Sequence, residues 1–307
     1  MKNDTQFRFA FTTKVMIPVI GIMVGLVAVT NWLIQDLITG QAHRASADRL
    51  MVSEQTYVQL SGMQDRELSF RYRAIPSDPR FKALAQLAAQ KGDRQTLRGV
   101  LLDIAEELNA SFIQYYTSEG VPFVGVSREQ PGSTFQEPVL SPSAVAGVIS
   151  GNSLTTPSTL DGRVYRVVAV PVEISQEVRS ALAVGNELTS AKAMEINGLI
   201  GCGIAFLVDG NIVVTSFRQP GIRRELERKM ESNLPPLSTE SRIHPVVLDD
   251  EHFLMMKGAI DAGERAASVS YILFFNYEPQ LRTLQETQRR LAVMGLFGIV
   301  LGSLVAG

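Results

Sequence analysis

The chain has 307 residues, a formal net charge of −2, 45% hydrophobic residues and 20% charged residues. This length suits about two domains, and the nearly neutral charge argues against a nucleic-acid partner. Cys202 is the single cysteine, so a disulfide framework and a metal site built on cysteines are both excluded.

A charge-free segment, VMIPVIGIMVGLVAVTNWLI, occupies residues 15–34. About 20 apolar residues in a helix cross a hydrocarbon layer of about 30 Å. A cleaved signal peptide is the alternative, but its apolar region would span about 7–15 residues and end at a small-residue cleavage site. Cationic residues precede the segment and a tryptophan stands near its end: Lys2, Arg8, Lys14 and Trp32. The sequence therefore predicts a cytoplasmic N-terminus, 1–14, and an uncleaved transmembrane helix, 15–37.

Helical patterns follow. Residues 41–75 contain one glycine and no proline, and their loosely helical spacing predicts a rod of about 50 Å that Pro76 ends. A second helix begins at 77–79, where Ser-Asp-Pro supplies a cap and a proline at the first helical position. A third helix covers 93–109, with Asp93 as its cap and an apolar stripe on one face.

The period then changes to that of strands. Residues 111–127 predict a strand, a turn at 118–120 and a second strand. A less regular stretch with four prolines follows, and then come two valine-rich strand candidates at 162–174 and 179–188. This helical prefix and the strands after it predict an antiparallel sheet of four or five strands.

The same order recurs in the second half of the chain, as a repeat of architecture and not of residues. A short helix at 189–200 precedes a strand, a turn at 209–211 and a strand. The remaining elements are a helix at 223–232, two strands around 249–251 and a last strand at 267–277. This repeat predicts a first unit at 38–190 and a second unit at 191–278.

The chain closes on a second charge-free segment, LAVMGLFGIVLGSLVAG, at 291–307, after a helix opened by Glu278-Pro279. Seventeen residues fall just short of a full span. The simplest interpretation is a connecting helix and an incomplete second transmembrane helix at 279–307, with further sequence beyond. Residues 38–290 would then lie outside the cytoplasm. Two arginines at 289–290 conflict mildly with the positive-inside rule, although the first span usually dominates.

Several stretches resemble the double Cache sensory domains of bacterial membrane receptors, which are paired PAS-like folds. They are RAIPSDPRFKAL, FIQYYTSEGVPFVGVS, GRVYRVVAVPVEISQEVRSALAVGNEL, IAFLVDGNIVVTSF and FFNYEPQLRTL. The likeness lies in element order and turn chemistry over about 38–290, and it is closest to sensors of two-component histidine kinases. It implies an α+β fold of two tandem PAS-like (Cache) units with antiparallel sheets on a long N-terminal helix, flanked by two transmembrane helices. Amino-acid-binding members carry an Arg-x-Trp-Tyr stretch, which this chain lacks.

The residues do not support catalysis. The three histidines, His43, His244 and His252, show no metal-ligand spacing, and no nucleophile-base set or P-loop occurs. The glycines at 198–203 lead into a strand instead of opening a helix, so they do not predict phosphate binding. We therefore expect no enzyme activity, cofactor or metal within this chain.

A ligand-binding role is the remaining option. The candidate residues lie on strands of the first unit: Tyr115, Tyr116, Arg163, Tyr165 and Arg166. An aromatic ring beside an arginine can hold a small anion or carboxylate. Strand alternation places Tyr115 and Tyr116 on opposite faces, and these residues could equally serve sheet packing or the rim. The strands of the second unit are mostly aliphatic, Met and Phe, which favours the first unit for a ligand.

Together these features predict a multi-pass protein of the inner (plasma) membrane, with residues 38–290 periplasmic or extracellular. It would be the input half of a signalling receptor, with the lipid bilayer as a partner and homodimer contacts through the membrane and juxtamembrane helices. The resemblance implies a histidine kinase as the output. Alternatives are a nucleotide cyclase, a chemoreceptor, or a membrane scaffold that does not signal.

Overall fold

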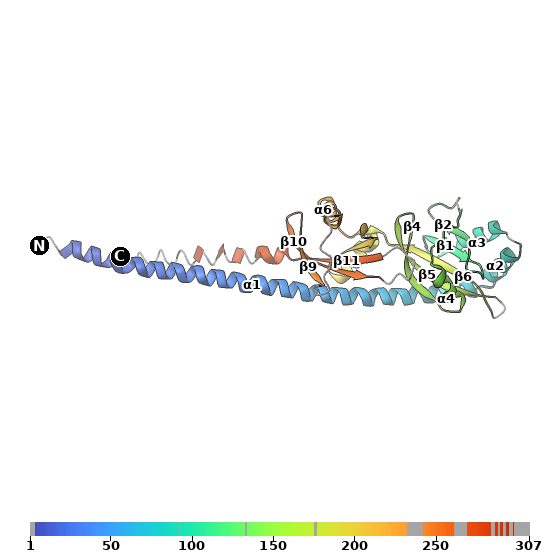
Figure 1. Ribbon diagram of the computed structural model, residues 1–307, viewed down its shortest axis with the longest axis horizontal. Coiled ribbons are helices and arrows are strands. Elements are labelled where there is room, and N and C mark those ends of the chain that lie inside the picture. Colours follow the sequence, from blue (N-terminus) through green and yellow to red (C-terminus); the bar gives the residue numbers. More distant parts are fainter. Residues whose placement is uncertain are drawn as a thin grey trace.

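The computed structural model describes residues 4–91, 93–132, 134–174, 177–231, 242–260, 269–283, 286–287, 289–290, 293–294 and 297. Two antiparallel sheets lie one after the other along a single helix, α1 (Asp4–Arg73), whose N-terminal half projects beyond both of them (Figure 1). The sequence predicts a membrane segment and a separate rod. The structure joins them into one helix, since no proline interrupts residues 19–75.

Within the part of the chain that the structure describes, no helix has a stretch long and apolar enough to cross a membrane. Most side chains of the predicted first span, 15–37, lie outside that description, and so do residues 298–307 of the predicted second span.

Three short helical elements lie at the far end of α1: η1 (Ile75–Ser77), α2 (Pro79–Lys91) and α3 (Arg94–Glu107). The predicted start signals are confirmed. The Asp78 carboxylate accepts a hydrogen bond from the backbone N–H of Arg80 at 2.7 Å. Asp93 accepts from the backbone N–H groups of Gln95 and Thr96, both at 3.1 Å. Each carboxylate satisfies N–H groups that have no partner in the first turn of a helix.

The first sheet has six strands in the order β3-β2-β1-β6-β5-β4. The strands are β1 (Phe112–Tyr116), β2 (Pro122–Ser127), β3 (Thr134–Phe135), β4 (Leu154–Leu160), β5 (Arg163–Ile174) and β6 (Glu177–Glu187). The prediction of four or five strands is wrong because the two outermost strands, β3 and β4, carry weak signals. β4 contains Pro157, which an edge strand tolerates since one side needs no ladder hydrogen bonds.

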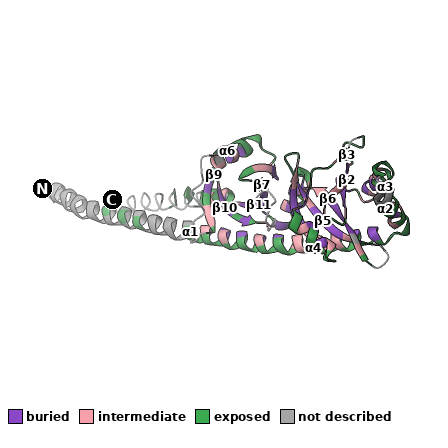
Figure 2. Ribbon diagram, turned by 45° about the vertical axis from the view of Figure 1, so that its right-hand side comes forward, coloured by how far each residue is buried: buried purple, intermediate pink, exposed green. Residues whose placement is uncertain are grey.

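Helices cover both faces of this sheet. Side chains of α2 and α3 and Tyr72 near the end of α1 pack on one face, in a cluster that includes Tyr115. The other face packs against α4 (Pro142–Ile149), in a cluster that includes Tyr116. The sequence predicts an irregular stretch here because of its prolines, and the helix is a correction to that prediction. The two tyrosines therefore lie on opposite faces, as predicted. Figure 2 shows buried residues concentrated in the sheets and exposed ones along the outer side of α1.

The second sheet has five strands in the order β8-β7-β11-β10-β9. Its α5 and α1 pack on one face and α6 on the other. The elements are α5 (Ser190–Ile200), β7 (Gly203–Val208), β8 (Asn211–Thr215), α6 (Pro220–Glu231), β9 (Ile243–Leu248), β10 (Glu251–Ala259) and β11 (Val269–Asn276).

Turn chemistry fixes the two hairpins of this sheet. Asp209 and Gly210 both have positive φ, at 50° and 85°, and so do Asp249 and Asp250, at 52° and 60°. Such turns match the right-handed twist of the strands that they connect, and Asp and Gly tolerate this conformation. Both turns confirm the sequence prediction.

The chain leaves the second sheet at Tyr277 and is helical over 278–283, where it runs beside α1 toward the N-terminal end of that helix (Figure 1). The Asn276 carboxamide oxygen accepts from the backbone N–H of Glu278 at 2.9 Å and so caps this exit helix. The Tyr277 ring contacts the ring of His43 in α1, with centroids 6.2 Å apart. The exit helix is therefore attached to α1 where it begins.

Candidate ligand-binding site

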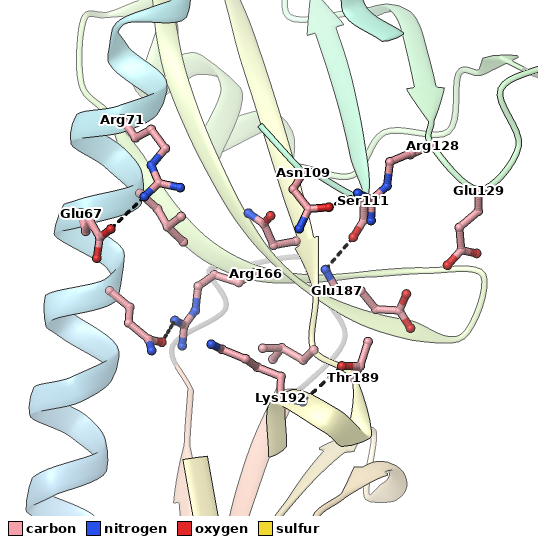
Figure 3. Close-up of a pocket in the computed structure, with 14 residues that line it drawn as sticks. Glu67, Arg71, Asn109, Ser111, Arg128, Glu129, Arg166, Glu187, Thr189 and Lys192 are labelled. Atoms are coloured by element: carbon pink, nitrogen blue, oxygen red, sulfur yellow. Dashed lines mark hydrogen bonds and ion pairs between the residues drawn. The ribbon is translucent and has the colours of Figure 1, made fainter. Parts of the chain in front are cut away.

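A cavity of about 480 Å³ lies between α1, one edge of the first sheet and the start of α5. Figure 3 shows polar and charged side chains from all three regions facing it. The lining residues are Gln64, Glu67, Leu68, Arg71, Asn109, Ser111, Arg128, Glu129, Arg166, Asn186, Glu187, Leu188, Thr189 and Lys192.

Antiparallel pairing brings these distant segments together. Phe112, at the start of β1, pairs with Ser127 at the end of β2 and with Gly185 near the end of β6. Arg166 of β5 pairs with Asn186 of β6. The residues just before β1 and just after β2 and β6 therefore meet at one edge of the sheet, where α1 passes.

Arg166 joins this edge to α1. Its guanidinium donates to Gln64 Oε1 at 2.7 Å and to Ser61 Oγ at 2.9 Å. Its Nε lies 3.3 Å from Asp65 Oδ1, within ion-pair distance, although that oxygen accepts no hydrogen bond. Burial raises the pKa of the Asp65 carboxyl, and the Arg166 charge offsets part of this rise. The main role of Arg166 is therefore to connect β5 to α1.

Most charges around the cavity are already paired. Arg71 pairs with Glu67 at 2.9 Å, and Lys192 pairs with Glu195 at 2.8 Å. Glu129 and Glu187 both pair with Arg163, at 2.6 and 3.3 Å.

Arg128 differs from these residues. Its guanidinium donates to the Asn109 carboxamide oxygen, and no carboxylate of the described residues lies within ion-pair distance. Of the four cations that line the cavity, Arg128 is therefore the one whose charge no carboxylate of the described residues neutralises. An anion entering the cavity would find this guanidinium available for a charge-assisted hydrogen bond.

The start of α5 adds a smaller positive contribution. Thr189 caps the helix by accepting from the backbone N–H of Lys192 at 3.2 Å, and both residues line the cavity. The N-terminal end of a helix carries a partial positive charge. Arg128 and this helix end are therefore the two parts of the cavity that would attract a small anion.

The structure does not bring the five predicted site residues together. Of the five, Arg166 alone lines the cavity; Arg163 is exposed and pairs with Glu129 and Glu187. Tyr115 is buried against Phe81 and Phe123, and Tyr165 packs on Phe112 with ring centroids 5.1 Å apart.

Tyr116 is fully buried and fixes the loop before α4. Its hydroxyl donates to Gln114 Oε1 at 2.5 Å and accepts from the backbone N–H groups of Val139 and Leu140, both at 3.1 Å. Burial raises the pKa of the Tyr116 hydroxyl to about 12. These contacts account for Tyr116 as a packing residue, one of the two alternatives that the sequence leaves open.

Sequence reasoning misses Arg128, Asn109 and Lys192. The available signal is weak, because Arg128 is one of several charged residues that directly follow a predicted strand. Among the residues that the structure describes, no group of three or more His, Cys, Asp or Glu side chains is placed to hold a metal ion.

No family model and no curated protein matches the chain. Solved structures similar to it include the sensory domain of the Campylobacter jejuni chemoreceptor Tlp3. The sequence identity is 9%, the match covers 80% of this chain and 97% of that chain, and the TM-score is 0.45. The ligand-binding domain of Tlp3 in complex with L-norvaline matches at 10% identity, 76% and 92% coverage and a TM-score of 0.45. The sensor domain of the V. cholerae histidine kinase DctB matches at 12% identity, 80% and 98% coverage and a TM-score of 0.42. These proteins are sensory domains of a chemoreceptor and of a histidine kinase.

Proposed function

We propose that the chain is the input module of a bacterial signalling receptor and that its signal is a small carboxylate or another small anion bound beside Arg128. The observation that carries this proposal is an arginine without a carboxylate partner among the described residues, at a cavity that three separate elements share. Ligand sites of this kind are concave, and a few fixed polar groups orient the ligand in them.

The position of the cavity supports a sensing role. Its lining includes Glu67 and Arg71 of α1 and Lys192 of α5, and α5 packs on the second sheet. A ligand that fits one arrangement of these elements better than another shifts the protein toward that arrangement. The shift would reach the exit helix through the second sheet, since β11 leads directly into Tyr277.

Membrane anchoring and the output belong to the same proposal. The charge-free run at 15–34, with cations before it, supports a first transmembrane helix and an extracytoplasmic position for both sheets. The first unit would span 38–190 and the second 191–278, followed by the connecting helix and second span at 279–307. The resemblance supports a histidine kinase as the output. We further propose a homodimer formed through the membrane and juxtamembrane helices.

The test is a melting-temperature screen with acetate, lactate, succinate and inorganic phosphate on the full chain in detergent. We expect at least one anion to raise the Tm, because a ligand that binds only the folded state stabilises it. Arg128→Gln should lower the affinity for that anion by about ten- to a hundredfold, since a charge-assisted hydrogen bond contributes roughly 1.5–3 kcal/mol.

Arg80→Gln is the matched control, because Arg80 is an exposed arginine of α2 that does not line the cavity. An anion that binds equally well to the parent and to Arg128→Gln would contradict the proposed site. Absence of any shift with all four anions would favour the scaffold alternative.

A further inference from the structure

A second cavity, of about 560 Å³, lies at one end of the second sheet. Strands β7 and β10 begin there and β11 ends there. The lining combines residues of these three strands with residues of α5 and α6 and the segment between β8 and α6. The strands of this unit are mostly aliphatic, Met and Phe, and their composition alone does not predict a ligand site. The structure instead leaves room beside the strand that leads into the exit helix.

Aromatic rings form the apolar wall of this cavity. The Phe217 ring meets the rings of Phe253 and Phe274 edge-on, with centroids 5.9 and 5.3 Å apart. Gly203 makes this arrangement fit, because a Cβ atom at that position would lie 3.1 Å from the Phe217 ring. Phe253 and Phe274 are almost fully buried and hold the partly exposed Phe217 ring in place, so Phe217 presents a rigid surface on which a flat apolar group can pack.

Two charged groups of opposite sign also line the cavity. The Arg218 Nε lies 3.1 Å from the Met194 sulfur, and within the described ranges no carboxylate is in ion-pair distance of this arginine. Glu251 Oε2 accepts from the Asn276 side-chain amide at 2.8 Å, and no described Lys, Arg or His pairs with it.

A purely anionic ligand would be attracted by Arg218 and repelled by Glu251. A ligand that also offers an N–H group can satisfy both side chains, because a carboxylate accepts hydrogen bonds only. The cavity therefore selects for an anionic group and an N–H donor on one apolar body.

We propose that this cavity is a second binding site, specific for small aromatic carboxylates that also carry an N–H group. The carboxylate would pair with Arg218, the N–H would donate to Glu251, and the ring would pack on Phe217 and its neighbours. Asn276 holds Glu251 with its side-chain amide and caps the exit helix with its carboxamide oxygen. A ligand bound at this site would therefore stabilise the start of the exit helix through Asn276. This second site does not require a ligand beside Arg128.

Indole-3-acetate is the probe, since it combines an aromatic ring, a carboxylate and an N–H group. Binding to the full chain in detergent is measured by calorimetry, with 2-naphthylacetate as the analogue without the N–H and 3-methylindole as the uncharged analogue without the carboxylate. We expect indole-3-acetate to bind at least tenfold more tightly than either analogue. Arg218→Gln should weaken it by ten- to a hundredfold, and Arg224→Gln, an exposed arginine of α6 outside the cavity, should leave it unchanged.

Hydrogen exchange provides a second readout. The backbone N–H groups of residues 274–280 should exchange more slowly with indole-3-acetate bound, in the parent and in Arg128→Gln alike. The proposal is overturned if all three compounds bind equally well, or if Arg218→Gln and Arg224→Gln weaken indole-3-acetate binding equally. It is also overturned if the protection from exchange appears only around Arg128. Loss of anion binding beside Arg128 with indole-3-acetate binding intact would contradict the first site alone.

Discussion

Arg166 of β5 donates a hydrogen bond to the side-chain oxygen of Gln64 in α1 at 2.7 Å, although 102 residues separate them in the sequence. Two further α1 residues, Ser61 and Asp65, contact the same guanidinium. The first sheet is thereby fixed to the long helix at the edge of the cavity. A movement of the sheet edge at this point must be accompanied by a movement of α1 or by the loss of these contacts.

The first prediction concerns the part of the chain that folds alone. Leu50, Tyr57 and Tyr72 of α1 are buried against the two sheets, so a fragment of residues 41–290 keeps the packed portion of the helix. We expect this fragment to be soluble and monodisperse, with mixed helix and strand by circular dichroism and cooperative unfolding in urea. A random-coil spectrum would contradict this prediction.

Arg166→Ala should lower the free energy of unfolding of this fragment by roughly 1.5–3 kcal/mol, because a charged group loses two hydrogen bonds and leaves Asp65 without its cation. Arg163→Ala is the matched control on the same strand. Arg163 pairs with carboxylates at an exposed position, and exposed pairs contribute about 0–1 kcal/mol. Equal losses in urea unfolding for the two variants would show that Arg166 does not fix α1 to the sheet.

Tyr116→Phe tests the buried hydroxyl. The substitution keeps the ring but removes the acceptor for the backbone N–H of Leu140, whereas Val139 retains Gln114 Oε1 as an acceptor at 3.1 Å. Leaving a buried donor without a partner costs about 1–3 kcal/mol, and urea unfolding should show a loss of this size. An unchanged midpoint would mean that water replaces the hydroxyl and that the loop before α4 does not depend on it.

The Glu278 carboxyl, at the start of the exit helix, should make the free energy of unfolding depend on pH. Hydrogen bonds from the His252 ring, at 2.7 Å, and from Arg282, at 3.1 Å, lower the pKa of the Glu278 carboxyl below its ordinary value of 4.5. A carboxyl group with a lowered pKa in the folded state stabilises the fold above its ordinary pKa. That contribution is lost as the pH falls through the lowered value.

Glu278→Gln should therefore be less stable than the parent at pH 6, and the difference should shrink as the pH falls below about 4.5. Urea unfolding of the 41–290 fragment between pH 2.5 and 6 measures it. Glu286→Gln, at an exposed position of the same segment, is the control. A difference that stays constant with pH would show that the carboxylate does not contribute through its charge.

The sequence predicts the elements better than the site. Helix starts and hairpins follow from local chemistry, as at Asp93 and at Asp209-Gly210, and they occur where they are expected. The edge strand β4 is missed because Pro157 and its polar neighbours resemble a loop, and only its place beside β5 makes it a strand. Arg128 could not be selected, because the other walls of the cavity that it faces, α1 on one side and β6 and α5 on the other, are distant from it in the sequence.

Transmission from the cavity to the exit helix is the central claim, and a distance measurement tests it. Gln41 of α1 and Thr283 of the exit helix are both exposed, so Gln41→Cys and Thr283→Cys can carry spin labels. Burial raises the pKa of the Cys202 thiol to about 11, so little of it is thiolate at neutral pH, and Cys202→Ser in the same background removes this thiol, which lines the second cavity.

The decisive measurement is the distance distribution between these two labels, recorded by pulsed electron paramagnetic resonance on the full chain in lipid nanodiscs. It is recorded with and without the anion that raises the Tm among acetate, lactate, succinate and phosphate. We expect that anion to shift the population between two distances, and Arg128→Gln to abolish the shift at the same anion concentration. A distribution that stays the same at a saturating anion concentration would contradict the account, because the cavity would then bind without signalling.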